Sequence, residues 1–108
     1  MTGPHSLGQL EQMILWTALR LGPKAYGMEI QRVLTRRTGR SVPSGAIYVT
    51  LRRLEEKGYV DSTPELRVGR QAGRPRRFVR ITSDGRRALR EARAALVGAW
   101  SGLESFVE

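Results

Sequence analysis

The chain has 108 residues, the size of one domain, and its 40% hydrophobic and 27% charged residues are typical of a folded protein. It has no cysteine, which excludes disulfides and thiolate metal sites, and no apolar run approaches the roughly 20 residues that cross a bilayer. A net charge of +9 favours a polyanionic partner over a membrane surface, and we expect a cytoplasmic protein without a cofactor.

The first predicted element is a helix over about residues 7–21. Ser6, followed three residues later by Gln9, has the spacing of a capping box at a helix start. Apolar residues then recur at helical intervals, namely Leu7, Leu10, Ile14, Ala18 and Leu21. Gly22-Pro23 ends this pattern, because proline cannot continue a helix.

Two further helices joined by a short link are predicted next. The first covers about residues 25–38 and ends before Gly39, which can adopt the left-handed conformation of a helix end. The second begins at Pro43 or Ser44 and ends at Lys57-Gly58. Two helices with a tight turn between them indicate a helix-turn-helix, whose second helix enters the major groove of DNA.

A hairpin with a long loop is predicted after these helices. Residues 59–63 and 77–81 are rich in strand-forming side chains, and the segment between them contains Gly69, Gly73 and Pro75. Between residues 67 and 90 the sequence has nine arginines against one acidic residue, Asp84. Nearly all of the net positive charge of the chain therefore lies in and after this hairpin, which we call the wing.

Thr82 or Ser83 is expected to cap the last helix, and Asp84 suits its positive first turn. Small and apolar residues follow at alternating steps of four and three, namely Gly85, Leu89, Ala92, Leu96, Ala99, Leu103 and Phe106. This spacing is typical of a seam between paired helices. A helix of about 24 residues would extend roughly 36 Å, and we expect a second copy of the chain to cover it.

These elements predict a mainly α (α+β) fold, a winged helix-turn-helix in the order α-α-α-β-β-α with a long C-terminal dimerisation helix. We assign residues 1–82 to the DNA-binding domain. Residues 83–108 are assigned to the dimerisation helix.

The outward face of the third helix is the predicted base-reading surface. If Ile47, Leu51 and Leu54 point inward, a turn of 100° per residue places a second set outward, namely Gly45, Tyr48, Val49 and Arg52, with Arg53 at its flank. Ser41 and Ser44 lie at the positive start of the helix, where phosphate is readily held.

An alternative for this face is that Tyr48 packs within the domain and that Arg52 pairs with Glu55 or Glu56. For the wing, we expect four arginines to stay free for phosphates or a minor groove, namely Arg70, Arg74, Arg76 and Arg77. A loop that merely keeps the protein soluble is the alternative.

The chain resembles the PadR family of winged-helix transcriptional regulators, and in particular its short members with one C-terminal dimerisation helix. The matching stretches cover about residues 7–92: LGQLEQMIL at the start, AYGMEI from residue 25, SGAIYVTLRRLEEKGYV from residue 44, and GRPRRFVRIT from residue 73 followed by DGRRAL. The resemblance implies a cytoplasmic homodimer that mostly represses nearby genes.

In this family the first helix assists the last in dimerisation, which implies a set of dimer contacts: Leu7, Leu10, Ile14, Leu89, Leu96, Ala99, Leu103 and Phe106. In some short members aromatic compounds enter the dimer interface beside tryptophan. Trp16 and Trp100 are the corresponding candidates here for binding a small aromatic effector. Ordinary packing of both indoles is the alternative.

The sequence thus predicts a homodimeric, sequence-specific regulator of double-stranded DNA, expected to be a repressor. The alternative is an architectural or protein-interaction module with the same fold and little sequence preference. We do not expect an enzyme, because the chain has one histidine, no cysteine, no clustered carboxylates and no phosphate-binding Gly-Lys-Ser/Thr loop. No metal site is expected for the same reason.

Overall fold

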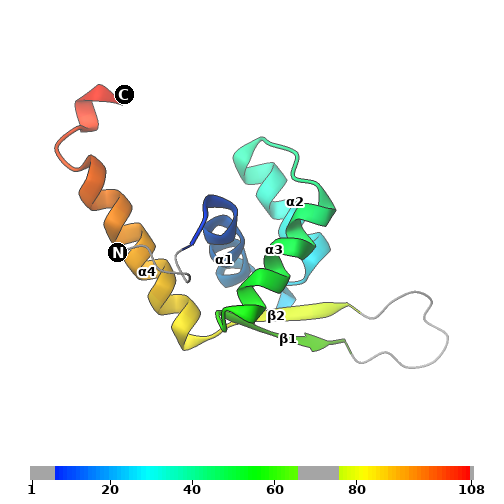
Figure 1. Cartoon of the computed structure of the whole chain (residues 1–108). Coiled ribbons are helices and arrows are strands. Elements are labelled where there is room, and N and C mark those ends of the chain that lie inside the picture. The colour runs from blue at the N-terminus through cyan, green and yellow to red at the C-terminus, as the bar shows by residue number, and fades with distance from the viewer. Residues whose placement is uncertain (1–6, 66–75, 108) are drawn as a thin grey trace.

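In the computed structural model, which describes residues 7–65 and 76–107, the chain folds in the expected order of helices and strands (Figure 1). The elements are α1 (Gln9–Leu21), the 3₁₀ turn η1 (Gly22–Lys24), α2 (Gly27–Thr38), α3 (Ser44–Glu56), β1 (Val60–Pro64), β2 (Arg77–Ile81), α4 (Ser83–Trp100) and the 3₁₀ turn η2 (Glu104–Phe106). This arrangement confirms a mainly helical winged helix. No helix of the described part is long and apolar enough to span a membrane.

The start of α1 differs from the predicted capping box. The helix begins at Gln9 with Gly8 as its N-cap, and a Glu11 carboxylate oxygen accepts the Gly8 backbone N–H at 2.8 Å. Glycine offers no side-chain oxygen, so the carboxylate three positions later provides the side-chain part of the cap. Gln9 does not have the predicted role, and Ser6 lies outside the described residues.

The core lies where α1, α2 and α3 meet the hairpin and the first turns of α4. Its largest fully buried side chains are Ile14, Leu15, Ile30, Leu34, Ile47, Leu54 and Leu89. Burial of each such side chain stabilises the fold by about 1.5–3 kcal/mol relative to leaving it in water. The helical periodicity of the sequence therefore marks the residues that hold the three helices together.

The two strands form an antiparallel hairpin in which Val60 pairs with Ile81 and Pro64 with Arg77. The segment before α2 joins the edge of β2, because the Val79 N–H donates to the Ala25 carbonyl at 2.7 Å. This contact fixes the hairpin to the start of the helix-turn-helix. β1 begins one residue later than predicted, since the Tyr59 N–H closes the end of α3 on the Leu54 carbonyl.

The start of α4 is attached to the junction of α3 and β1. Thr82 caps the helix by accepting the Gly85 N–H at 3.0 Å, and its hydroxyl donates to the Gly58 carbonyl at 2.7 Å. The Thr82 N–H donates to the Tyr59 carbonyl at 3.0 Å. A Cβ on Gly85 would lie only 2.2 Å from that carbonyl oxygen, so this close approach requires glycine.

The last helix is shorter than predicted. α4 has 18 residues and ends at Trp100, and Gly102 turns the chain with a φ of 90°. The helix therefore extends about 27 Å instead of about 36 Å. Leu103 and Phe106 follow this turn, so they do not continue the seam along one helix. Figure 1 shows α4 projecting away from the other helices towards the C-terminus.

Candidate nucleic-acid interface

The outward face of α3 carries the predicted base-reading residues. Ile47 and Leu54 are fully buried, whereas five residues are exposed, namely Gly45, Tyr48, Val49, Arg52 and Arg53. Leu51, which was expected to point fully inward, is only half-buried. The helix therefore offers a mixed surface of one aromatic, one aliphatic and two cationic side chains.

Tyr48 has a packing role as well as an exposed surface. A Cβ added to Gly27 would lie 2.6 Å from the Tyr48 ring, so the ring rests directly on the start of α2. Tyr48 nevertheless remains 48% exposed. Packing and accessibility, which the sequence presented as alternatives, occur together: α2 orients the ring and part of it faces solvent.

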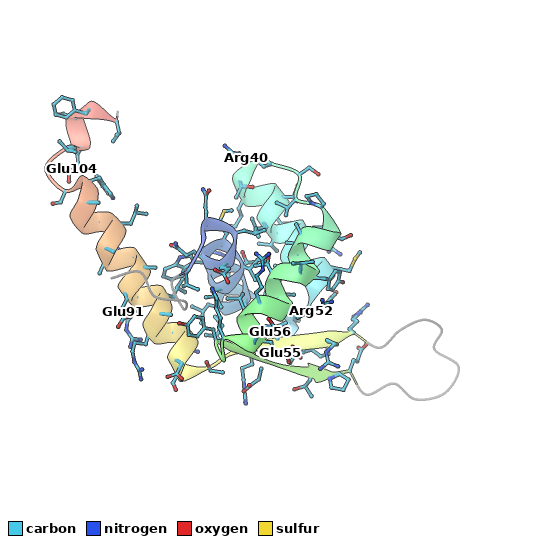
Figure 2. All side chains as sticks on the ribbon, in the orientation of Figure 1. Arg40, Arg52, Glu55, Glu56, Glu91 and Glu104 are labelled. Carbon is cyan, nitrogen blue, oxygen red and sulfur yellow. The ribbon has the colours of Figure 1, made fainter. Side chains whose placement is uncertain are left out.

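Arg52 forms no side-chain hydrogen bond or ion pair with any residue of the described ranges 7–65 and 76–107. The predicted alternative, an ion pair with Glu55 or Glu56, is absent there. Glu55 instead accepts the Ser62 hydroxyl at 2.7 Å. Figure 2 shows the labelled Arg52, Glu55 and Glu56 along the C-terminal half of α3. The guanidinium of Arg52 is thus available for an external acceptor.

The N-terminus of α3 is free of negative charge. Pro43 is its N-cap without a side-chain cap bond, and its first turn has no acidic residue. Ser41 and Ser44 are exposed beside it. The first backbone N–H groups of a helix lack internal acceptors and have partial positive charge. This end of α3 can therefore receive a phosphate.

Arg76 and Arg77 lie at the root of the wing, where β2 begins, and they are not free as predicted. The Arg76 guanidinium lies 4.6 Å from the centroid of the Tyr26 ring, in a cation–π contact. Arg77 donates from Nη2 and Nε to the Ser62 hydroxyl at 2.9 and 3.3 Å. Both residues are exposed but have partners within the chain. Arg70 and Arg74 lie outside the described residues.

A groove of about 560 Å³ separates α3 from the hairpin. Tyr26 and Tyr48 contribute aromatic walls, and Arg52, Arg76 and Arg77 add three cations against the carboxylate of Glu55. The sequence pattern does not predict that Tyr26, Gly27 and Ser62 line this groove. Their roles depend on residues that are distant in sequence, and no local spacing indicates them.

The predicted dimer residues fall into three groups by their burial. Ile14 and Leu89 have 0% and 2% exposure and belong to the core of one chain, and Leu7 and Leu10 are half-buried. Leu96, Ala99, Leu103 and Phe106 are exposed. Large apolar side chains that the prediction did not include are also exposed here, namely Val97 and Val107. Trp16 and Trp100 are 42% and 39% exposed.

Solved structures of transcriptional regulators share this arrangement. One from Clostridium thermocellum has a TM-score of 0.72 and 23% identity, with 92% of this chain and 90% of that chain covered. A putative regulator from Thermoplasma acidophilum has a TM-score of 0.69 and 25% identity over 91% and 93% of the two chains. A PadR family regulator from Clostridium difficile has a TM-score of 0.70 and 22% identity over 94% and 100%.

No match was found among curated protein sequences. The family model of the PadR-like transcriptional regulators matches residues 17–91, from α1 through the hairpin to the first half of α4. The matched segment contains α3, both strands of the hairpin and the close approach at Gly85. The chain therefore belongs to the PadR-like family of transcriptional regulators.

Proposed function

We propose that the protein is a sequence-specific DNA-binding repressor that acts as a homodimer on a pseudo-palindromic operator. The observation that carries this proposal is the exposed face of α3. On this face the Tyr48 ring is accessible, and Arg52 has no hydrogen-bond or ion-pair partner in the described part of the chain. Arginine can donate two hydrogen bonds to guanine in the major groove, and tyrosine can contact phosphate or a thymine methyl.

Dimerisation is supported by the exposed apolar side chains of the C-terminal region, which include Leu96, Val97 and Phe106. Water contact with such a group of side chains is unfavourable, and a second copy would remove it. The two copies of α3, acting as recognition helices, would then contact half-sites separated by about one turn of DNA, roughly 34 Å. We also propose Trp16 and Trp100, both partly exposed, as the surface for a planar aromatic effector that relieves repression.

The test is selection of genomic DNA fragments by the purified protein, followed by mobility shifts of the retained fragment at a fixed salt concentration. We expect Arg52→Ala to lower affinity for the retained fragment by about 1–3 kcal/mol and to relax the preference at one base position. Arg20→Ala, which removes an exposed cation from α1, is the matched control. Equal binding to every fragment would instead favour the architectural module.

A further inference from the structure

Two sets of side-chain contacts hold the root of the wing against the helix-turn-helix. The first centres on Tyr26, which lies just before α2. Its ring stacks under the Arg76 guanidinium at 4.6 Å and meets the Phe78 ring edge-to-face at 5.7 Å. Phe78 belongs to β2, and Tyr26 also forms an isolated backbone bridge with it. The start of α2 is therefore bound to the second strand of the wing.

The second set links the wing to the recognition helix. Arg77 of β2 donates to the Ser62 hydroxyl of β1, and that hydroxyl donates to a Glu55 carboxylate oxygen of α3 at 2.7 Å. One hydroxyl thus joins both strands to the last turn of α3. A two-stranded hairpin alone is marginally stable in water, so these contacts add to the burial of Val60, Val79 and Ile81 in holding the wing.

We infer that Tyr26, Glu55, Ser62, Arg76 and Arg77 form a bracket that sets the position of the wing relative to α3. In this bracket Arg76 and Arg77 are positioning residues, and their main effect on DNA binding is through the hairpin instead of through phosphate neutralisation. The inference rests on the proposed DNA-binding function. It assigns a role to Glu55, a carboxylate on the rim of the groove that would otherwise only repel DNA.

Glu55→Ala tests the inference by the sign of its effect on DNA affinity. If electrostatics alone acts, removal of a carboxylate beside a polyanion tightens binding. The bracket predicts the opposite, a loss of about fivefold, because the Ser62 hydroxyl loses its acceptor. Glu56→Ala is the matched control, since Glu56 is the exposed neighbour on the same helix and has no side-chain partner in the described ranges. We expect it to leave affinity unchanged or to raise it.

Ser62→Ala separates position from charge, because it leaves the net charge of the protein unchanged. We expect a loss of about fivefold at every salt concentration. The slope of log affinity against log salt concentration should equal that of the wild type, whereas the loss of one phosphate contact would reduce it by about 0.9. Arg77→Ala should also lower affinity without this change of slope. A slope reduced by a full contact in Arg77→Ala would overturn its positioning role.

The contacts of Tyr26 with Arg76 and Phe78 form the aromatic half of the bracket, and they are tested with Tyr26→Leu and Tyr26→Phe. Phenylalanine retains the ring face under Arg76 and the edge contact with Phe78, so it should keep most of the affinity that leucine loses. Equal losses in the two variants, or none in either, would overturn this half of the bracket.

A measurement on the free protein separates this inference from the proposed function. Amide hydrogen exchange at the β1–β2 ladder and at Val79 should become about fivefold faster in Glu55→Ala and Tyr26→Leu, but not in Glu56→Ala. If the wild type binds no DNA, the proposed function fails while the exchange result still decides whether the bracket exists. Unchanged exchange in both bracket variants would overturn it.

Discussion

The two halves of α4 lie in opposite environments. In the first half, Gly85 and Leu89 are buried against the body of the fold, and the capping residue Thr82 is bonded to the junction of α3 and β1. In the second half, Leu96 is 62% exposed, and every residue from 93 to 100 is exposed. One helix with one continuous pattern therefore has two environments: its first turns stabilise the single chain, and its last turns are the exposed surface that we propose for the dimer.

The largest expected effect is the difference in stability between Leu89→Ala and Leu96→Ala, which are the same substitution seven residues apart. Leu89→Ala should lower the free energy of unfolding by about 3 kcal/mol, because it leaves a cavity in the core. Leu96→Ala should leave the isolated chain as stable as the wild type but weaken its self-association. Denaturant unfolding and sedimentation at several protein concentrations measure both quantities. Self-association unchanged by Leu96→Ala would contradict a dimer contact at this position.

Gly85→Ala should cause the next largest loss of stability. The added Cβ would lie 2.2 Å from the Tyr59 carbonyl oxygen, so α4 must move away from the α3–β1 junction. We expect the free energy of unfolding to fall by about 2–3 kcal/mol. Gly98→Ala is the control on the exposed half, because no atom of the described residues, apart from the adjoining backbone of α4, lies within 4 Å of its added Cβ. At protein concentrations that keep the chain monomeric, this control should be neutral or stabilising by up to about 1 kcal/mol.

Glu11→Gln tests an ion pair that joins α1 to the end of α3. The Lys57 Nζ lies 2.7 and 3.0 Å from the two Glu11 carboxylate oxygens, and the side chains are only 19% and 9% exposed. Removing one charge should cost about 1–2 kcal/mol of unfolding free energy, because the other charge stays partly buried. Glu29→Gln breaks the more exposed pair with Arg32 and should cost less than about 0.5 kcal/mol. Equal losses would contradict the importance of burial.

The smallest expected effect is a loss of folding stability at alkaline pH, caused by Tyr59. Burial raises the pKa of the Tyr59 phenol, and the negative charges of Asp84, Glu91 and Glu11 raise it further. The unfolded chain therefore releases this proton first as pH rises through about 10, so the contribution of Tyr59 to stability is lost above that pH. Titration of phenolate absorbance measures the shift. Tyr59→Phe should flatten the loss of stability with alkaline pH, and an identical slope in this variant would contradict the assignment.

The arginines of the predicted DNA-binding stretches differ in whether they have partners within the chain. Arg52 and Arg77 both belong to stretches predicted to contact DNA, and both are exposed. Only the structure distinguishes them, because Arg77 donates to Ser62, fifteen positions away, while Arg52 has no partner in the described part of the chain. Likewise Tyr26 and Arg76 are fifty positions apart. Sequence spacing reports which residues share a helix face, but it does not report which distant side chain meets them.

The order of the elements, the buried stripes of α1, α2 and α3, and the turn at Gly39, whose φ is 71°, could all be predicted from the amino-acid sequence. These features follow from local rules, since helical periodicity and the steric freedom of glycine act within a few residues. Three other features became visible only in the folded chain: the end of α4, the pairing of Glu11 with Lys57 and the contacts at the root of the wing. Such features depend on which surfaces come together when the chain closes its core, and they join residues that no local pattern relates.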